Sequence, residues 1–351
     1  YVKSCGKHPD ADRLSVCVID DGSGVPNQVV CGAPNIAQGL TIAFARVGAV
    51  IPQNQTVLKK GKLRGVDSCG MVCSAQELML GKDGEGIIEL ESSLVPGTPI
   101  AQVYHLDHTI FDISITPNRS DCFNVRGIAR DLAAYGLGRF IDDTDQLGLN
   151  HSHPAASIQI HDQDICPYFS VVKIKNVTNK PSPDWLRKRI EDAGQQSISA
   201  LVDIMNYVMY DLGQPLHVFD AQQIKGGFHV QKAGAGVPYL ALNEENYTLD
   251  GDIVISDDEK ILSLAGIKGG HRGSSTMDTT EIFIEAALFN PIHIAGTGQR
   301  LKLFSDARAR FERGIDPQMT QKALAKAVAC VLDICGGQVV GYSESGMGCS
   351  A

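Results

Sequence analysis

The sequence predicts a multidomain α+β chain, in which a small N-terminal β-barrel is followed by a larger domain of mixed helices and strands. Its 351 residues exceed one ordinary domain and suit two. Short β-branched runs separated by Gly, Pro and Asn dominate residues 1–108, whereas helical periodicity appears only after them. We therefore expect domains at 1–108 and 151–351, joined by a strand–helix scaffold and a linker at 109–150.

The first domain is expected to be a barrel because about five short strands suit that architecture. The strand-like runs are "SVCVIDD", "NQVVCGA", "LTIAFARVGAVIP" and "GIIELES". The one dense basic stretch of the chain, "KKGKLRG", carries Lys59, Lys60, Lys62 and Arg64. A short basic loop is usually only solvated, and the net charge of −9 argues against nucleic-acid binding by charge alone. Local contact with nucleic acid is the alternative for this stretch.

The scaffold segment is expected to contain a strand, a break and a helix. "FDISI" (111–115) alternates apolar and polar residues as a strand does, and "TPNRSDC" (116–122) breaks the chain. "VRGIARDLAAYG" (125–136) gathers its apolar residues on one helical face and ends at a glycine. Residues 137–156 are polar with weak periodicity, and we interpret them as a linker.

The second domain is expected to mix helices with strands. Helices are predicted for "SPDWLRKRIEDAG" with Ser182 as its cap, for "SALVDIMNYVMYDLG" ending at Gly213, and for "DPQMTQKALAKAVACVLDICGG" with Asp316 as its cap. The strand-like runs between them are "YFSVVKIKNV", "GFHVQKA", "DIVISDD", "ILSLAGI" and "EIFIEAALF".

Several classes of protein are not indicated. No phosphate loop, H-E-x-x-H or nucleophile elbow occurs. The ten cysteines include no C-x-x-C pair, so we expect no metal site and reduced thiols, as in a cytosolic protein. No run of about 18 apolar residues predicts a membrane span. The sequence has no signal-peptide pattern. It starts without Met, at a Tyr1 that leads straight into a strand-like run, so we expect a piece of a longer polypeptide.

A cluster of polar residues around "NYVMYDLGQPLHVFD" (206–220) raises the question of function. Two interpretations are open: the side chains satisfy one another as a structural knot, or they line a pocket. In the first, His217 caps a carbonyl group and Glu285, which interrupts the apolar run "EIFIEAALF", pairs with an arginine such as Arg310. In the second, the glycines of "AGIKGGHRG" (265–273) let the backbone approach a ligand closely.

A series of motifs favours the pocket. In chain order they are "HPDADRL", "VVCGAPNI", "GAVIP", "KLRGVDSCGMVCS", "TPNRSDC", "NYVMYDLGQPLHVFD", "GGHRG" and "FERGIDP". This series, which covers almost the whole chain, resembles the N-terminal half of the β subunit of bacterial phenylalanyl-tRNA synthetases. The resemblance implies an oligonucleotide-binding (OB-fold) barrel that binds tRNA, followed by a B3/B4 module that hydrolyses tyrosine mistakenly attached to the phenylalanine tRNA.

The same resemblance implies the residues of an editing pocket. By motif, the catalytic residues would be His217, Asn206 and Gly269, and the bound tyrosine would contact Glu285, Ser305 and Ala307. We add Gly270 to the catalytic residues for its backbone N–H. The basic residues Lys59, Lys60, Lys62 and Arg64 would contact tRNA. The chain departs from the family pattern at Met205, Gln196 and Ser305.

The residue types suit such chemistry. An ionised carboxylate such as Glu285 accepts strongly from a phenol, and it is left unpaired when phenylalanine binds. Backbone N–H groups at Gly269 and Gly270 could hold the carbonyl oxygen, while His217 and Asn206 orient water or the terminal ribose. We expect direct attack by water, because no Ser or Cys lies in a nucleophile–base arrangement.

The family also implies partners and cofactors. The partners would be tRNA(Phe) and a synthetase α subunit in an (αβ)2 enzyme; this piece needs no cofactor, whereas the whole enzyme uses ATP and Mg. We expect a cytoplasmic protein without membrane contact. One alternative is a tRNA-binding scaffold whose editing pocket is inactive, and a second is a structural subunit whose pocket binds another small ligand.

Overall fold

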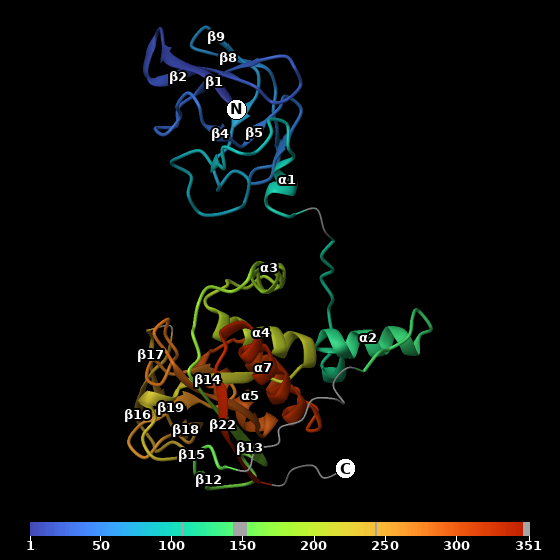
Figure 1. Ribbon diagram of the computed structural model, residues 1–351, viewed down its shortest axis with the longest axis vertical. Helices are drawn as coiled ribbons and strands as arrows, with labels where there is room; N and C mark the ends of the chain where they lie inside the picture. The colour runs from blue at the N-terminus through green and yellow to red at the C-terminus, as the bar shows by residue number, and fades with distance from the viewer. Residues whose placement is uncertain (107–108, 143–152, 243, 347–351) are drawn as a thin grey trace. The chain divides into compact units, whose positions relative to one another are not determined.

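The computed structural model describes residues 1–106, 109–142, 153–242 and 244–346. The chain divides into two compact units, Tyr1–Phe111 and Asp112–Ala351, and each is described separately (Figure 1). Residues 143–152, which hold half of the predicted linker, lie outside the described residues.

The first unit is built from short antiparallel ladders. β1 (Val2–His8), β2 (Ala11–Ile19) and β3 (Asn27–Cys31) form its largest sheet. The remaining strands form two-stranded ladders: β4 (Thr41–Ile42) with β11 (Glu89–Leu90), β5 (Phe44–Ala45) with β10 (Met71–Val72), β6 (Val50–Ile51) with β7 (Thr56–Val57), and β8 (Gly61–Leu63) with β9 (Val66–Ser68). A short helix, α1 (Ile100–Val103), follows them.

The described strands of this unit pair in separate ladders, and no closed barrel is found among them, so the small barrel and its OB-fold assignment stay predictions. The predicted run "LTIAFARVGAVIP" is divided among β4, β5 and β6. One reason is Gly48, whose φ of +95° turns the chain between β5 and β6. Two small clusters of buried apolar side chains support the ladders, one centred on Ile19 and Val29 and the other on Ile51 and Ile88.

The second unit contains two sheets. The first has the order β14 (Leu216–Asp220), β21 (Glu281–Leu288), β13 (Tyr168–Lys175), β22 (Gln338–Gly346), and all its pairs are antiparallel. The second has the order β12 (Ile158–Ile160), β15 (Phe228–Lys232), β18 (Ile253–Ser256), β19 (Ile261–Leu264), β20 (Lys268–Gly269). A separate hairpin joins β16 (Val237–Leu240) to β17 (Asn246–Leu249).

Helices and the second sheet cover opposite faces of the first sheet. Helices α3 (Asp184–Asp192), α4 (Ala200–Leu212) and α7 (Met319–Cys335) share a core with Val172, Val218 and Ile284 on one face (Figure 1). On the other face, Phe169, Phe219 and Phe283 share a core with side chains of the second sheet. Because side chains alternate along a strand, neighbouring positions of β21 point into different cores.

Most predicted elements of the second unit are confirmed, with local corrections. The predicted scaffold helix is α2 (Val125–Ala134), which packs against α4. Pro183 is the residue that precedes α3, and the hydroxyl group of Ser182 donates to Asp203 instead of capping the helix. α7 begins at Met319, two residues after the predicted start, because Asp316 caps a preceding turn by accepting from Gln318 N–H.

Two further differences concern loops and short helices. Residues 111–115, predicted as a strand, have no strand conformation and no partner among the described residues. The sequence interpretation missed α5 (Pro291–Leu301) and α6 (Asp306–Phe311), which both begin after asparagine or serine caps. Within the described part of the chain, no helix is long and apolar enough to cross a membrane.

Candidate functional site

Four of the predicted site residues line one small cavity in the second unit. It has a volume of about 70 Å³ and lies where β14 and β21 meet the β19–β20 turn and α6. The predicted residues in its wall are His217, Gly269, Glu285 and Ala307. The structure therefore brings together segments that are far apart in the sequence.

His217 and Glu285 are directly opposite each other in the β14–β21 ladder. Side chains at such paired positions lie on the same face, with Cβ atoms about 4.5–5.5 Å apart. Glu285 is only 5% exposed, and neither side chain has a hydrogen bond or ion pair within the described residues. This is an unusual state for a buried carboxyl group, which is costly to ionise without a partner.

Burial shifts both groups towards their neutral forms. It raises the pKa of Glu285 to about 8. It lowers the pKa of His217 to about 4. At neutral pH the pair therefore consists of a carboxylic acid and an uncharged imidazole.

The arginine partner proposed for Glu285 in the structural interpretation is absent. Arg310 forms its ion pair with Asp306, at 3.5 Å, and its guanidinium group stacks on the rings of Phe123 and Tyr210. The Glu285 carboxyl group faces the cavity and has no ion-pair partner among the residues that the structure describes.

The imidazole ring of His217 is positioned by packing. Its centroid lies 4.5 Å from that of Phe219, in an edge-to-face arrangement. A Cβ atom at position 269 would lie 2.7 Å from His217 Cε1, so only glycine leaves room for the ring. Gly269 is thus required for the close approach of the β20 backbone to the imidazole.

Gly270 and Ser305 do not line the cavity. The Gly270 N–H donates to the Leu262 carbonyl oxygen at 2.9 Å, so this group is engaged in the sheet and the oxyanion role predicted for it is not supported. Ser305 Oγ donates to the Ile267 carbonyl oxygen at 2.8 Å and accepts from Arg308 N–H at 3.0 Å. Ser305 therefore fixes the start of α6, which places Ala307 in the cavity wall.

Asn206 does not join the cavity. It lies on α4, which covers the face of the first sheet opposite to His217 and Glu285. Two of the departures from the family pattern also lie outside the cavity wall, because Met205 is buried in the core beneath α4 and Gln196 is exposed. They do not alter the lining.

Sequence reasoning missed several residues of the wall. Phe289 and Phe311 form an edge-to-face pair with centroids 5.2 Å apart, and Ser263 and Lys268 come from the β19–β20 hairpin. Ser263 carried a signal, since it is the one polar residue of the apolar run "ILSL". The two phenylalanines gave no signal beyond ordinary core residues.

Other polar residues of the 206–220 stretch form a structural knot. The buried amide of Gln214 donates to the Pro215 and Ala287 carbonyl oxygens and accepts from the Thr320 hydroxyl group. The Asp220 carboxylate accepts from the hydroxyl group of Thr279 at 2.9 Å. Both interpretations thus apply, each to different residues.

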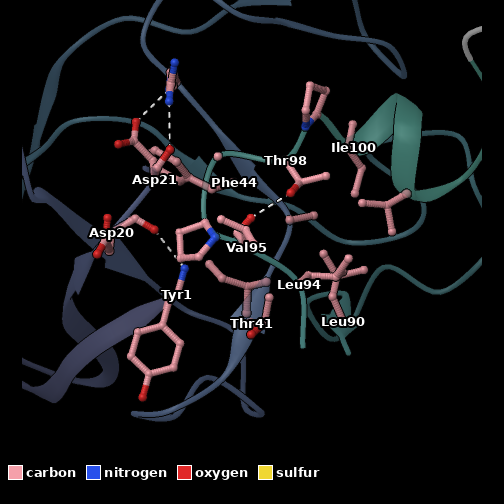
Figure 2. Close-up of a pocket in the computed structure, with 17 residues that line it drawn as sticks. Tyr1, Asp20, Asp21, Thr41, Phe44, Leu90, Leu94, Val95, Thr98 and Ile100 are labelled. Atoms are coloured by element: carbon pink, nitrogen blue, oxygen red, sulfur yellow. Dashed lines mark hydrogen bonds and ion pairs between the residues drawn. The ribbon is translucent and has the colours of Figure 1, made fainter. Parts of the chain in front are cut away.

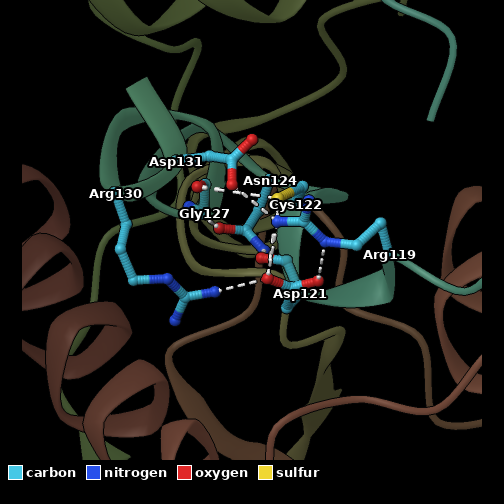
Figure 3. Close-up of polar contacts among 7 residues, drawn as sticks. All are labelled: Arg119, Asp121, Cys122, Asn124, Gly127, Arg130 and Asp131. Atoms are coloured by element: carbon cyan, nitrogen blue, oxygen red, sulfur yellow. Dashed lines mark hydrogen bonds and ion pairs between the residues drawn. The ribbon is translucent and has the colours of Figure 1, made fainter. Parts of the chain in front are cut away.

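The "TPNRSDC" motif is held by ion pairs and a helix cap (Figure 3). Arg119 pairs with Asp121 and Asp131, and Arg130 also pairs with Asp121. Asn124 caps α2 by accepting from the Gly127 N–H. Arg119 and Asp121 of the motif are engaged with each other and with side chains of α2, so we assign these two residues a structural role.

The four predicted tRNA-contacting residues lie together in the first unit. Lys59 and Lys60 directly precede the β8–β9 hairpin, which carries Lys62 and Arg64, and all four are exposed. Arg64 and Gly65 form its two-residue tip with positive φ angles of +44° and +85°, as hairpin turns require. We call residues 59–68 the basic hairpin.

A larger hollow of about 320 Å³ lies elsewhere in the first unit (Figure 2). Its wall includes Phe44, Leu90 and Ile100. The charged groups at its side are already paired, because Arg46 Nε donates to the Asp21 carboxylate at 2.6 Å. The hollow is larger than the His217–Glu285 cavity but contributes no comparable unpaired group.

Comparisons with known proteins find one family match in each of the two units. Residues 1–99 match the family described as a putative tRNA binding domain, and residues 165–336 match the B3/4 domain family. The chain is 45% identical over 338 residues to the phenylalanine–tRNA ligase β subunit of Rhodopseudomonas palustris, covering 96% of this chain and 42% of that protein. It is 46% identical over 343 residues to the β subunit of Paramagnetospirillum magneticum, covering 96% and 43%.

A solved structure was also matched, an N-terminal fragment of the phenylalanyl-tRNA synthetase β subunit from Pyrococcus horikoshii. The TM-score is 0.30 and the identity 17%, over 53% of this chain and 60% of that one, which is too slight to define the fold.

The matches define the chain as a subunit segment of an aminoacyl-tRNA synthetase, with a tRNA-binding domain and a B3/4 domain. It belongs to the phenylalanine–tRNA ligase β-subunit family. The chain spans less than half the length of the curated relatives that it matches.

Proposed function

We propose that the second unit removes tyrosine from mischarged tRNA(Phe) by hydrolysis, in the cavity between His217 and Glu285. The observation that carries this proposal is the Glu285 carboxyl group, which is buried, unpaired and directed into a cavity opposite an imidazole ring. Such a group can accept a hydrogen bond from a phenol hydroxyl, and it loses that bond when phenylalanine binds.

The proposed reaction is direct hydrolysis of the aminoacyl ester. A water oxygen bonds to the ester carbonyl carbon, the bond to the ribose oxygen breaks, and the proton goes to that oxygen. A histidine whose pKa is lowered to about 4 is a weak base at neutral pH. We therefore assign His217 the orientation of the water and Glu285 the recognition of the tyrosine hydroxyl. Water is the only co-reactant, so this step uses no ATP.

The cavity must widen to accept a phenol ring. An apolar cavity of about 150 Å³ holds benzene, whereas this one measures about 70 Å³. The lining side chains and the β19–β20 turn therefore have to move when tyrosine binds. This size also supports the second candidate, a tRNA-binding scaffold whose cavity does not catalyse editing.

The partners proposed for the chain are tRNA(Phe), through the first unit, and a synthetase α subunit, with the cytoplasm as the site of action. Deacylation of Tyr-tRNA(Phe) by the chain separates the two candidate functions. Hydrolysis that depends on Glu285 supports editing. Binding of tRNA without hydrolysis in the presence of the α subunit supports the scaffold.

A further inference from the structure

We propose that Cys5 and Cys17 are an oxidation site, at which a hydroperoxide converts the two thiols into a disulfide that links β1 to β2. The two residues are direct partners in the antiparallel β1–β2 ladder. Their sulfur atoms are 3.3 Å apart, and Cys17 Sγ donates to Cys5 Sγ. The site lies in the first unit and is independent of the proposed editing cavity.

The backbone already has the spacing that a disulfide needs. Paired residues in antiparallel strands have Cα atoms about 4.5–5.5 Å apart, and disulfides span about 4.4–6.8 Å. The bond can therefore form by side-chain rotation, without moving either strand.

The third cysteine of this region is less well placed. Cys31 on β3 pairs with Ser15, so it lies diagonally from Cys17, and β2 separates it from Cys5. Diagonal neighbours are about 7–8 Å apart and second-neighbour strands more than 9 Å apart. Both separations exceed the reach of a disulfide, and this geometry selects the Cys5–Cys17 pair.

The two thiols differ in accessibility, which gives the reaction an order. Cys5 is half-buried, whereas Cys17 is completely buried. Burial raises the pKa of Cys17 to about 12, so this thiol forms little thiolate. Cys5 is therefore the residue that meets the oxidant.

The chemistry balances in two steps. The Cys5 sulfur attacks the hydroperoxide and becomes a sulfenic acid, while the peroxide is reduced to water (or an alcohol). The Cys17 sulfur then displaces hydroxide from the sulfenic sulfur, which forms the S–S bond and releases a second water. Two thiols have lost two electrons to the peroxide, and a thiol reductant reverses the change.

Peptide mapping tests the proposal. The full chain is reduced, freed of reductant, treated with hydrogen peroxide, alkylated at its remaining thiols and analysed by mass spectrometry after digestion. We expect a linked Cys5–Cys17 peptide that disappears on reduction, and alkylation of Cys31 unchanged. A linked peptide that includes Cys31, or sulfinic acid at Cys5 without any link, would overturn the proposal.

Two variants sharpen the result. Cys31→Ala, the matched control, should form the link as the parent does. Cys17→Ala should lose the link and accumulate sulfenic and sulfinic acid at Cys5. Because Cys17→Ala removes a buried side chain and could unfold the unit, melting of the parent provides a second measurement. The oxidised parent should melt about 5 °C or more above the reduced parent. An equal or lower melting temperature would contradict a link between these paired positions of β1 and β2.

Discussion

Glu285 and His217 face each other across neighbouring antiparallel strands, in a cavity where neither has a polar partner among the described residues. Both groups are held in their neutral forms by burial alone. A structural pair would be satisfied by hydrogen bonds, because leaving a buried polar group unpaired costs about 1–3 kcal/mol. The unsatisfied state fits a site that completes its hydrogen bonds only when a ligand enters.

Replacing Glu285 by alanine should remove the preference for tyrosine over phenylalanine. The phenol hydroxyl would lose its acceptor, which costs about 0.5–1.5 kcal/mol for a hydrogen bond to a neutral carboxylic acid, or about two- to tenfold in relative affinity. Affinities for both amino acids should be measured together with thermal melting. Because Glu285 has no arginine partner in the described part of the chain, the melting temperature should not fall sharply. A large loss of stability with an unchanged preference would contradict the recognition role.

The stability of the chain should depend on pH through Glu285. Its pKa is about 8 in the folded chain and near 4.5 when unfolded, so between these values the folded state binds more protons. Glu285 therefore destabilises the fold progressively as the pH rises from 4.5 to 8. The neutral isostere in Glu285→Gln lacks this effect.

The test compares the free energy of unfolding of Glu285→Gln with that of the parent. The free energy of unfolding of the variant, relative to that of the parent, should rise by on the order of 3 kcal/mol between pH 5 and pH 8. His217, whose pKa is lowered to about 4, contributes equally to both proteins and cancels. A difference that does not change with pH would show that Glu285 is ionised in the folded chain.

Substituting His217 should reduce turnover more than selectivity. An imidazole that orients the attacking water contributes to the rate, by about 10²-fold when a reacting group loses its position, but does not contact the tyrosine hydroxyl. His217→Ala should therefore deacylate Tyr-tRNA(Phe) slowly while keeping its preference for tyrosine. Asn206→Ala is the control, since α4 lies on the other face of the sheet; a comparable loss of rate in this variant would contradict the placement of the site.

The placement of Asn206 shows what the sequence could and could not predict. The helix at 200–212 and the strand at 281–288 were predictable, because long periodic or apolar runs define them. The grouping of Asn206 with His217 rested on their closeness in the chain. The side chains of a helix and of the strand that follows it can, however, lie on opposite faces of the sheet. The pairing of His217 with Glu285 depends on strand register, which no local pattern specifies.

The first unit shows a different limit. Its strands are mostly two or three residues long, and their partners come from distant parts of the chain. Local propensity finds such strands but not their pairing, so the separate ladders of the described strands could not be predicted from the sequence. The positive φ angle of Gly48 was visible only in the structure.

Gln214 should be required for stability and not for selectivity. Its side chain joins the carbonyl oxygens of Pro215 and Ala287 to the hydroxyl group of Thr320. Gln214→Leu leaves these groups unpaired and should lower the free energy of unfolding by about 1–3 kcal/mol or more. Denaturant titration checks this, with Gln196→Leu at an exposed position as the control. A change in tyrosine preference, without loss of stability, would place Gln214 in the site instead.

The basic hairpin should make a small, salt-dependent contribution to tRNA binding. Residues 1–105 carry nine basic and ten acidic side chains, so few phosphates can be neutralised by this unit. The Lys60 and Lys62 Nζ atoms also lie 3.5 and 3.7 Å from the carboxylate oxygens of Asp67, which partly offsets their charge.

Each phosphate contact contributes about 0.7–0.9 to the slope of log affinity against log salt. Replacing Lys59 and Arg64 together by alanine in the full chain should therefore reduce that slope by about 1.4–1.8. The control is Lys82→Ala, which replaces an exposed lysine outside the hairpin and should leave the slope unchanged. Titration of labelled tRNA(Phe) at several salt concentrations measures both slopes, and an equal effect of the two variants would show that the hairpin is not a specific contact.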